Sequence, residues 1–248
     1  ERAVELARQV KVETEPLPAV FSIDQAIQAN SFFNIHHRID DGDVKKEESE
    51  SEVVVSGEVR MGGQEHFYLE TNCTLVVPSD NGQLEVFAST QNPTKTQNFC
   101  AHVCGIPATH VVCRTKRLGG GFGGKETRSV FISCAAAVAA SKLRRPVKIN
   151  IERDIDMCIT GQRHPFMARY RAGATKDGRL KFFEADLYNN AGFSLDLSAA
   201  VMDRALFHSD NVYRWPAFSV RGHLCKTNLP SNTAFRGFGG PQGLMLVE

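Results

Sequence analysis

The sequence lacks the features that mark several large classes of protein. No run of apolar residues is long enough to cross a membrane, and no secretory signal is visible at the start of the chain. The net charge of +1 at pH 7 gives no electrostatic reason to bind nucleic acid or an anionic membrane surface. We therefore expect neither a nucleic acid nor a membrane as a partner.

Metal-binding cysteine pairs are also missing. The 7 cysteines include no C-x-x-C pair. Cys100, His102 and Cys104 are close enough to suggest a metal site, but in a helix over residues 97–105 the two cysteines share a face that His102 does not. We expect these thiols to be reduced and to lie in a core, which fits a cytoplasmic or peroxisomal location.

What is present is enough apolar sequence for a sizeable core, with 42% hydrophobic residues in a chain of 248. The chain begins with Glu1 rather than methionine and ends at Glu248 within an apolar helical pattern, so we expect it to be a piece of a longer protein. Residues 40–52 are mostly Asp, Glu, Lys and Ser, a composition that cannot order itself alone. We interpret them as an exposed connector that marks a domain boundary near residue 50.

The chain is organised around a glycine-rich stretch at residues 117–128, which reads RLGGGFGGKETR. Its clustered glycines let the backbone adopt positive φ and present its N–H groups to an electron-rich group. A β-branched run precedes it at residues 110–116, and an alanine-rich helical pattern follows at residues 127–143. The pattern predicts a strand, a glycine loop and a helix whose dipole points at a bound ligand, rather than at another part of the protein.

Two nucleotide-binding patterns fit this loop by letter. Residues 119–124 satisfy G-x-G-x-x-G, but the acid expected about 20 residues later is missing, because the first one, Glu152, comes too late. Residues 119–125 satisfy most of G-x-x-x-x-G-K-[ST], but the last position is Glu126, whose carboxylate would repel a phosphate. ATP or GTP binding is disfavoured, and a dinucleotide-binding domain stays as an alternative of another class.

The rest of the chain alternates strand and helix patterns. Strands are predicted at residues 10–15, 53–61, 69–77, 84–90, 146–153, 167–174, 180–188 and 220–225, and helices at 1–7, 22–29, 195–208 and from Pro93 and Pro241. Gln91, between a strand and the helix at Pro93, fits a turn or a ligand contact equally. Residues 229–243 form a second glycine loop with the same Phe-Gly-Gly sequence. Two such loops imply two backbone cradles around one large ligand.

These motifs together resemble the molybdenum hydroxylase family, and within it the eukaryotic xanthine dehydrogenase/oxidases. The resemblance covers nearly the whole chain and is densest at residues 62–71, 117–128, 202–208 and 225–243. It implies an α+β fold with mixed sheets, in which residues 51–248 form the first part of a molybdopterin-binding domain. Residues 1–50 would then be the end of a preceding small, hammerhead-like α/β domain with its connector.

The resemblance also implies roles at a molybdenum centre. Gln91 would hydrogen-bond an oxo or sulfido ligand of the metal, Phe122 would lie near its apical face, and Arg236 would lie at the centre on the second loop. The pterin dithiolene, rather than a side chain, would supply the sulfur ligands. The backbone expected to contact the cofactor is that of Gly120, Gly121, Phe122 and Gly123.

Substrate contacts follow from the same resemblance. Glu126 and Arg204 match a pair that grips a purine from opposite sides, and Phe238 matches one of two phenylalanines that sandwich its ring. Arg204 would stabilise negative charge that develops on the purine. The alternatives are an ion bridge between Glu126 and Arg204 and an exposed ion pair of Arg204 with Asp203. Aldehyde oxidases of the family typically have apolar residues at both positions, so this pair favours xanthine and hypoxanthine over aldehydes.

The implied parent protein hydroxylates hypoxanthine and xanthine to urate in purine catabolism. Electrons would pass through 2Fe-2S clusters and FAD to NAD or O2 in a homodimer. The general-base glutamate is expected beyond Glu248, so we expect the fragment alone to be inactive. A non-catalytic relative would be expected to have lost Gln91, Glu126 or Arg204, and all three are present.

Overall fold

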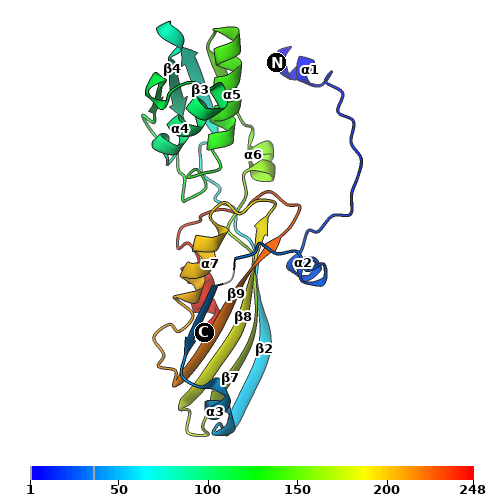
Figure 1. Cartoon of the computed structure of the whole chain (residues 1–248), viewed down its shortest axis with the longest axis vertical. Helices are drawn as coiled ribbons and strands as arrows, with labels where there is room; N and C mark the ends of the chain where they lie inside the picture. Colours follow the sequence, from blue (N-terminus) through cyan, green and yellow to red (C-terminus); the bar gives the residue numbers. More distant parts are fainter. Residues whose placement is uncertain (1, 36) are drawn as a thin grey trace.

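The protein, seen in a computed structural model that describes residues 2–35 and 37–248, has two lobes joined at a narrow junction (Figure 1). A small sheet with two helices forms one lobe, and a long, twisted sheet forms the other. Both sheets mix parallel and antiparallel pairing, which confirms the α+β prediction. No helix in the described part of the chain has the length and apolar character needed to span a bilayer.

The small lobe is a four-stranded sheet covered by helices. Its strands are β3 (Cys73–Pro78), β4 (Leu84–Ala88), β5 (Val111–Arg114) and β6 (Val147–Asn150), in the order β5-β4-β3-β6, and its helices are α4 (Pro93–Cys104) and α5 (Val130–Leu143). Short 3₁₀ turns lie at Asp80–Gly82 and Ala108–His110. An Asn-Gly turn joins β3 to β4, with Asn81 at φ +58°. Cys100 lies in the core between the helices and the sheet, and Cys104 packs against that core, as expected.

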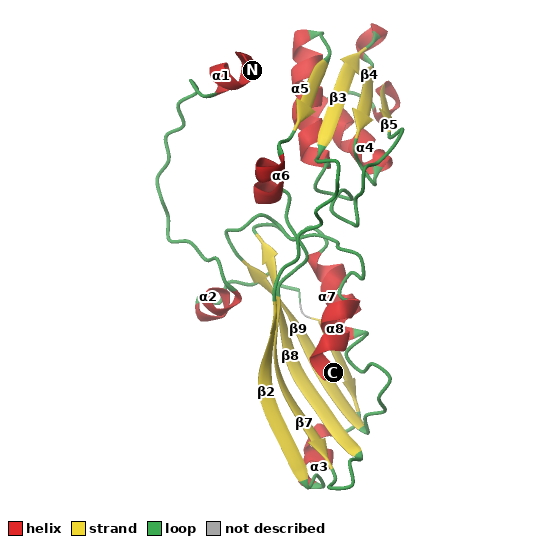
Figure 2. Ribbon diagram, turned by 180° about the vertical axis from the view of Figure 1, so that it is seen from behind, coloured by secondary structure: helices red, strands yellow, loops and turns green. Residues whose placement is uncertain are grey.

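The large lobe is a five-stranded sheet. Its strands are β1 (His37–Asp41), β2 (Val53–Met61), β7 (Phe166–Ala174), β8 (Leu180–Gly192) and β9 (Ala217–Lys226), in the order β1-β9-β8-β7-β2. Apolar residues alternate onto the face that α7 (Ser198–Leu206) and α8 (Gly240–Val247) cover (Figure 2). The opposite face is charged. Ion pairs there join Arg169 to Glu58, Arg171 and Arg221 to Glu184, and His223 to Asp186.

The N-terminal region departs from the sequence predictions in two places. The predicted strand at residues 10–15 is wrong, because these residues are exposed and pair with no other strand. Residues 40–52 are not a structureless connector, since they contain the end of β1 and the helix α3 (Val44–Ser49), which ion pairs such as Lys181 with Glu47 tie to β8. The domain boundary near residue 50 stays a prediction about the longer protein.

Two short helices and one unpredicted helix complete the fold. α1 (Arg2–Ala7) buries no residue, and α2 (Ile23–Gln28) is capped by Ser22, which forms a capping box with Gln25. α6 (Arg153–Ile159) lies at the junction between the lobes, where the sequence predicted the end of a strand and a polar turn. It forms there because buried Asp156 accepts hydrogen bonds from the Tyr68 hydroxyl and the Asn72 N–H, both at 2.6 Å.

Candidate functional site

The two glycine loops meet at the junction between the lobes. The N–H of Arg236 in the second loop donates to the carbonyl of Phe122 in the first, at 2.9 Å. Gly123 has no room for a side chain, because a Cβ there would lie 2.6 Å from the carbonyl oxygen of Ala234. The structure therefore brings together two segments that the sequence places more than a hundred residues apart.

Several N–H groups of the first loop bind protein side chains. The N–H of Gly119 donates to Glu70 Oε2 at 2.8 Å, and Gln91 Oε1 accepts from the N–H groups of Gly123 at 2.9 Å and Lys125 at 3.2 Å. The first loop was expected to present its N–H groups to a ligand and not to protein. This expectation is wrong for the N–H groups of Gly119, Gly123 and Lys125. Occupied N–H groups also disfavour the dinucleotide alternative, which needs them for a pyrophosphate.

A buried lysine closes the end of the first loop. Lys125 is fully buried, and its Nζ donates to the Glu70 carbonyl and to Ser89 Oγ, each at 2.6 Å, and lies 4.5 Å from the centre of the Tyr68 ring. Burial lowers the pKa of the Lys125 ammonium. Burial would also raise the pKa of Glu70, but donation from Gly119 and Ser89 and the nearby Lys125 ammonium outweigh it, so this pKa is lowered.

The centre of the first loop presents Phe122 and leaves Gln91 with a free donor. Phe122 has a φ of +51° and is 46% exposed, an unusual conformation for a bulky side chain and one found at ligand-contacting sites. A Cβ on Gly121 would lie 2.5 Å from Gln91 Oε1, so only glycine allows this contact. Gln91 itself is exposed, and within residues 2–35 and 37–248 its Nε2 has no hydrogen-bond acceptor.

The second loop packs directly on the backbone of α7. Gly239, with φ +132°, and Gly243 would place a Cβ 2.1 Å from the Val201 carbonyl oxygen and 2.2 Å from that of Ala205. Arg204 shares this side of α7, because it follows Val201 by three residues. Its side chain is exposed. Phe238, also at positive φ (+60°), packs against the core beneath α7.

Glu126 lies where the first loop approaches α7. Its neighbour Thr127 donates to Asp196 Oδ2 at 2.9 Å, and the Thr127 hydroxyl lies 3.1 Å from that of Thr233 in the second loop. The sequence left two structural alternatives to substrate binding by Glu126 and Arg204: an ion bridge between them, and an ion pair of Arg204 with Asp203. No ion pair joins Glu126 to Arg204 in the part of the chain that the structure describes. Asp203 does not pair with Arg204 but forms an ion pair with His37.

Sequence reasoning missed four residues that hold these loops. Glu70 and Lys125 fix the first loop, and His66 and Arg163 contact the second, through Ala234 and Arg236. The Nε2 of His66 lies 2.7 Å from the Ala234 carbonyl oxygen. The position of Lys125 inside the glycine-rich stretch was the sequence signal for this role. A lysine that only needs contact with water would more often lie on an exposed helix or turn.

The residues at the junction fit a large cofactor. The geometry offers two glycine loops back to back, an unpaired Gln91 amide N–H and the exposed guanidinium groups of Arg204 and Arg236. In the described ranges, no group of three or more His, Cys, Asp or Glu side chains is arranged to hold a metal ion.

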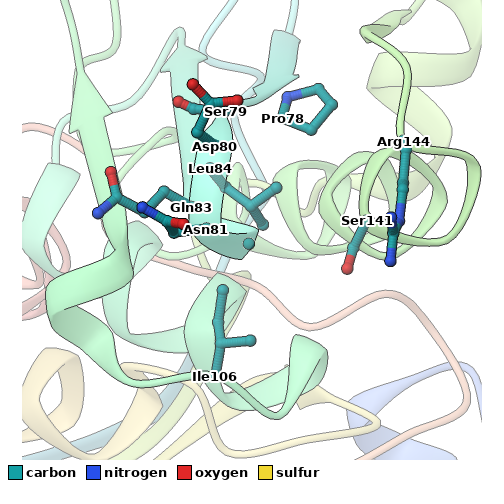
Figure 3. A pocket seen from close by; sticks show the side chains of 10 residues that line it. Pro78, Ser79, Asp80, Asn81, Gln83, Leu84, Ile106, Ser141 and Arg144 are labelled. Carbon is teal, nitrogen blue, oxygen red and sulfur yellow. The ribbon is translucent and has the colours of Figure 1, made fainter.

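A pocket lies away from the glycine loops. It has a volume of about 630 Å³ and belongs to the small lobe (Figure 3). The turn at residues 78–84 forms one side, and Ser141 and Arg144 from the end of α5 form the other. The exposed Phe122 of the first glycine loop does not line this pocket.

Comparison with known proteins gives consistent matches. A family model described as "Molybdopterin cofactor-binding domain" matches residues 26–248. The chain is 55% identical to a xanthine dehydrogenase of Dictyostelium discoideum over 247 residues, and 54% identical to a xanthine dehydrogenase/oxidase of Rattus norvegicus over 249. Both alignments cover 100% of this chain but only 18% and 19% of those proteins, so the chain spans about a fifth of their length.

A solved structure has the same fold. An aldehyde oxidoreductase from Desulfovibrio gigas matches with a TM-score of 0.88 and 26% sequence identity, covering 99% of this chain and 28% of that one. A CO dehydrogenase from Oligotropha carboxidovorans matches with a TM-score of 0.84 at 21% identity, which shows the fold alone.

Proposed function

The chain belongs to the molybdopterin cofactor-binding domain family, and we propose that it is part of a xanthine dehydrogenase/oxidase that hydroxylates hypoxanthine and xanthine. The resemblance predicted from the sequence is confirmed at the level of the family. Because the chain spans about a fifth of its relatives, the activity is proposed for the longer protein. We expect the isolated chain to be inactive.

One structural observation carries this proposal. The backbone contact between Phe122 and Arg236, together with the packing of Gly239 on α7, brings both loops and the helix of Arg204 to one place. Eight of the nine predicted site residues lie in these segments. The ninth, Gln91, binds the first loop. This arrangement supports the proposal that a single large ligand at the junction contacts all of them.

The chain's own residues would hold the cofactor through backbone and amide groups. The Gln91 Nε2 donor and the backbone of residues 120–123 would orient it, and Arg236 would add positive charge beside it. When bound, the molybdenum cofactor supplies the two-electron oxidation of the substrate and the oxygen that is inserted. Glu70 and Lys125 fix the loop in advance, so that little reorganisation accompanies binding.

Three side chains would bind the purine. Arg204 would hydrogen-bond it and stabilise the negative charge that develops on its ring, a contribution of about 3 kcal/mol where water is excluded. The Glu126 carboxylate would accept a hydrogen bond from an N–H on the opposite side of the ring. The ring of Phe238 would stack on the purine, with its position fixed by the hydrogen bond from its N–H to the Phe235 carbonyl at 2.7 Å.

The longer protein would contain the remaining parts of the electron path. We propose 2Fe-2S clusters and FAD in other domains, NAD or O2 as the final acceptor, a homodimeric assembly and a cytoplasmic or peroxisomal location. These follow from the similarity to xanthine dehydrogenases alone. An aldehyde oxidase is disfavoured, because the relatives at 54–55% identity are xanthine dehydrogenases and because Glu126 and Arg204 are both charged.

The test compares two substrates in the full-length protein. We would measure kcat/KM for xanthine and for an aromatic aldehyde in the wild type, in Arg204→Met and in the control Arg179→Met, which changes an exposed arginine in the β7–β8 turn. We expect Arg204→Met to lower kcat/KM for xanthine by about 100-fold while aldehyde turnover persists. The purine assignment would be refuted if the wild type prefers the aldehyde and Arg204→Met changes kcat/KM for neither substrate.

A further inference from the structure

The ring of Phe235, in the second glycine loop, is held between two side chains from outside the loop. The His66 ring stacks on it with centroids 4.6 Å apart and planes tilted by 25°. The guanidinium carbon of Arg163 lies 4.1 Å from the Phe235 ring centroid. We call His66, Phe235 and Arg163 the Phe235 clamp. Neither His66 nor Arg163 has a role in the proposed reaction.

His66 joins the two glycine loops. Its Nε2 lies 2.7 Å from the carbonyl oxygen of Ala234, an acceptor, so the ring must carry its proton on this nitrogen. A Cβ on Gly124 would lie only 2.7 Å from His66 Cγ, so the ring also touches the first loop. Burial lowers the pKa of His66, which keeps the imidazole neutral between the loops.

Arg163 holds the second loop from its other side. Its Nη2 donates to the Arg236 carbonyl at 2.7 Å and its Nε to Gln64 Oε1 at 2.9 Å. A planar guanidinium can make both bonds while its face lies on the Phe235 ring, which an ammonium group cannot do. Within residues 2–35 and 37–248 no carboxylate forms an ion pair with Arg163, so its role here is not that of a charge partner.

The Phe235 clamp contacts the backbone beside the residues expected to bind the ligand. Arg163 bonds the backbone of Arg236, and the Phe235 carbonyl accepts the N–H of Phe238. Gly237 lies between them at φ +98°, where the chain has wide conformational freedom unless its neighbours are fixed. The clamp therefore adds to the bond between the Arg236 N–H and the Phe122 carbonyl in holding this part of the second loop.

We propose that the Phe235 clamp positions the second glycine loop, and that Arg163 is the positioning residue on which Arg236 and Phe238 depend. The catalytic part of this inference rests on the proposed function, while the effect on loop motion does not. Loss of the clamp frees the loop locally and leaves the small lobe unchanged, because the clamp contacts no residue of α4 or α5.

The experiment uses the full-length protein and the variants Arg163→Met and Arg163→Lys. Arg169→Met is the matched control, because Arg169 follows on the same chain segment but pairs with Glu58 on the charged face of the sheet. Backbone hydrogen exchange would be followed by mass spectrometry in residues 232–243 and in α4. Molybdenum content per chain, kcat and KM for xanthine would be measured on the same samples.

We expect Arg163→Met to speed exchange in residues 232–243 by about tenfold or more, with α4 unchanged. Molybdenum content falls, and kcat/KM for xanthine falls by about 10- to 100-fold, mostly in kcat, because the reacting groups are misplaced. Arg163→Lys recovers part of the loss, since one donor and the charge remain. Arg169→Met matches the wild type in all measurements.

Two results would overturn the inference. Unchanged exchange in residues 232–243 would show that Arg163 does not hold the loop, and equal acceleration in α4 would show a global stabilising role. If Arg163→Met fails to fold, Phe235→Leu, which keeps apolar volume but removes the ring face, gives the same two readings. If the wild type does not oxidise xanthine but Arg163→Met still speeds exchange in residues 232–243, the proposed function is refuted. The positioning role of the Phe235 clamp is then still supported.

Discussion

The two glycine loops share the sequence Phe-Gly-Gly, but different forces hold them in place. In the first loop, side-chain acceptors on Glu70 and Gln91 bind backbone N–H groups, and buried Lys125 closes the end. In the second loop, Gly239 lies against the backbone of α7 and the ring of Phe235 is held by its neighbours. Side-chain oxygens thus bind backbone N–H groups of the first loop, whereas the second loop combines side-chain contacts to its carbonyls with close backbone packing on α7.

The close packing on α7 predicts that substitution of Gly239 is strongly destabilising. Gly239→Ala would combine a φ of +132° with a Cβ 2.1 Å from the Val201 carbonyl oxygen. We expect the local stability of residues 232–243 in the full-length protein to fall by about 3–5 kcal/mol, the sum of backbone strain and overpacking. Hydrogen exchange of this segment measures the loss.

A glycine with the same kind of backbone but open surroundings provides the control. Gly105 ends α4 at φ +67°, and a Cβ there would have nothing within 4 Å. Gly105→Ala should cost only about 1 kcal/mol, the price of the conformation alone. If the two variants lose equal stability, the contact with α7 contributes nothing, and close backbone packing does not hold the second loop.

Removing the charge that anchors the first loop should have the next largest effect. Lys125→Met leaves the Glu70 carbonyl and Ser89 without their buried donor. We expect a loss of about 2–3 kcal/mol, below the usual figure for a broken buried pair because Glu70 is partly exposed. Exchange should accelerate in residues 117–128 and not in residues 232–243. Lys148→Met, on exposed β6, should leave both segments unchanged.

Acid should loosen the second loop before the first. Burial lowers the pKa of His164 to about 3 from an ordinary 6.5, and this histidine bonds Ser198 at the start of α7. Between these values the unfolded chain binds a proton that the folded chain does not, so stability is complete above pH 6.5 and falls as the pH falls. The slope is about 1.4 kcal/mol per pH unit.

Glu70, in contrast, has a pKa lowered from 4.5, so its contribution is lost only as the pH falls below that value. Lowering the pH from 7 to 5 should therefore accelerate exchange, after correction for intrinsic rates, in residues 161–168 and 232–243 while residues 117–128 stay protected. Simultaneous opening of both loops would show that His164 does not set the acid stability of this region.

The smallest expected effect concerns Gln91. Gln91→Ala removes the acceptor for the N–H groups of Gly123 and Lys125, and water can replace it because the position is exposed. We expect a loss of about 1 kcal/mol in the first loop. Molybdenum content of the full-length protein should fall more clearly, since the free Nε2 donor is lost as well. Gln83→Ala, an exposed glutamine in the β3–β4 turn, should change neither quantity.

Local signals in the sequence predicted most of the elements. The Ser22 capping box, the Asn81 turn and the proline at the start of α4 depend on residues within a few positions of one another, and each is found. Residues 10–15 alternate like a strand yet form none, because a strand also needs a pairing partner that no local pattern can supply. Residues 153–159 form α6 because Asp156 is bound by residues more than 80 positions away.

The sequence by itself determined the family, the two glycine loops and the residues expected to meet the ligand, because glycine clusters and short motifs are readable without knowledge of distant contacts. Tertiary structure alone decided what holds the loops. Glu70 reaches Gly119 across 49 residues and His66 reaches Ala234 across 168. Such contacts exist only once both lobes are folded, since they join groups whose proximity is set by packing rather than by neighbouring sequence.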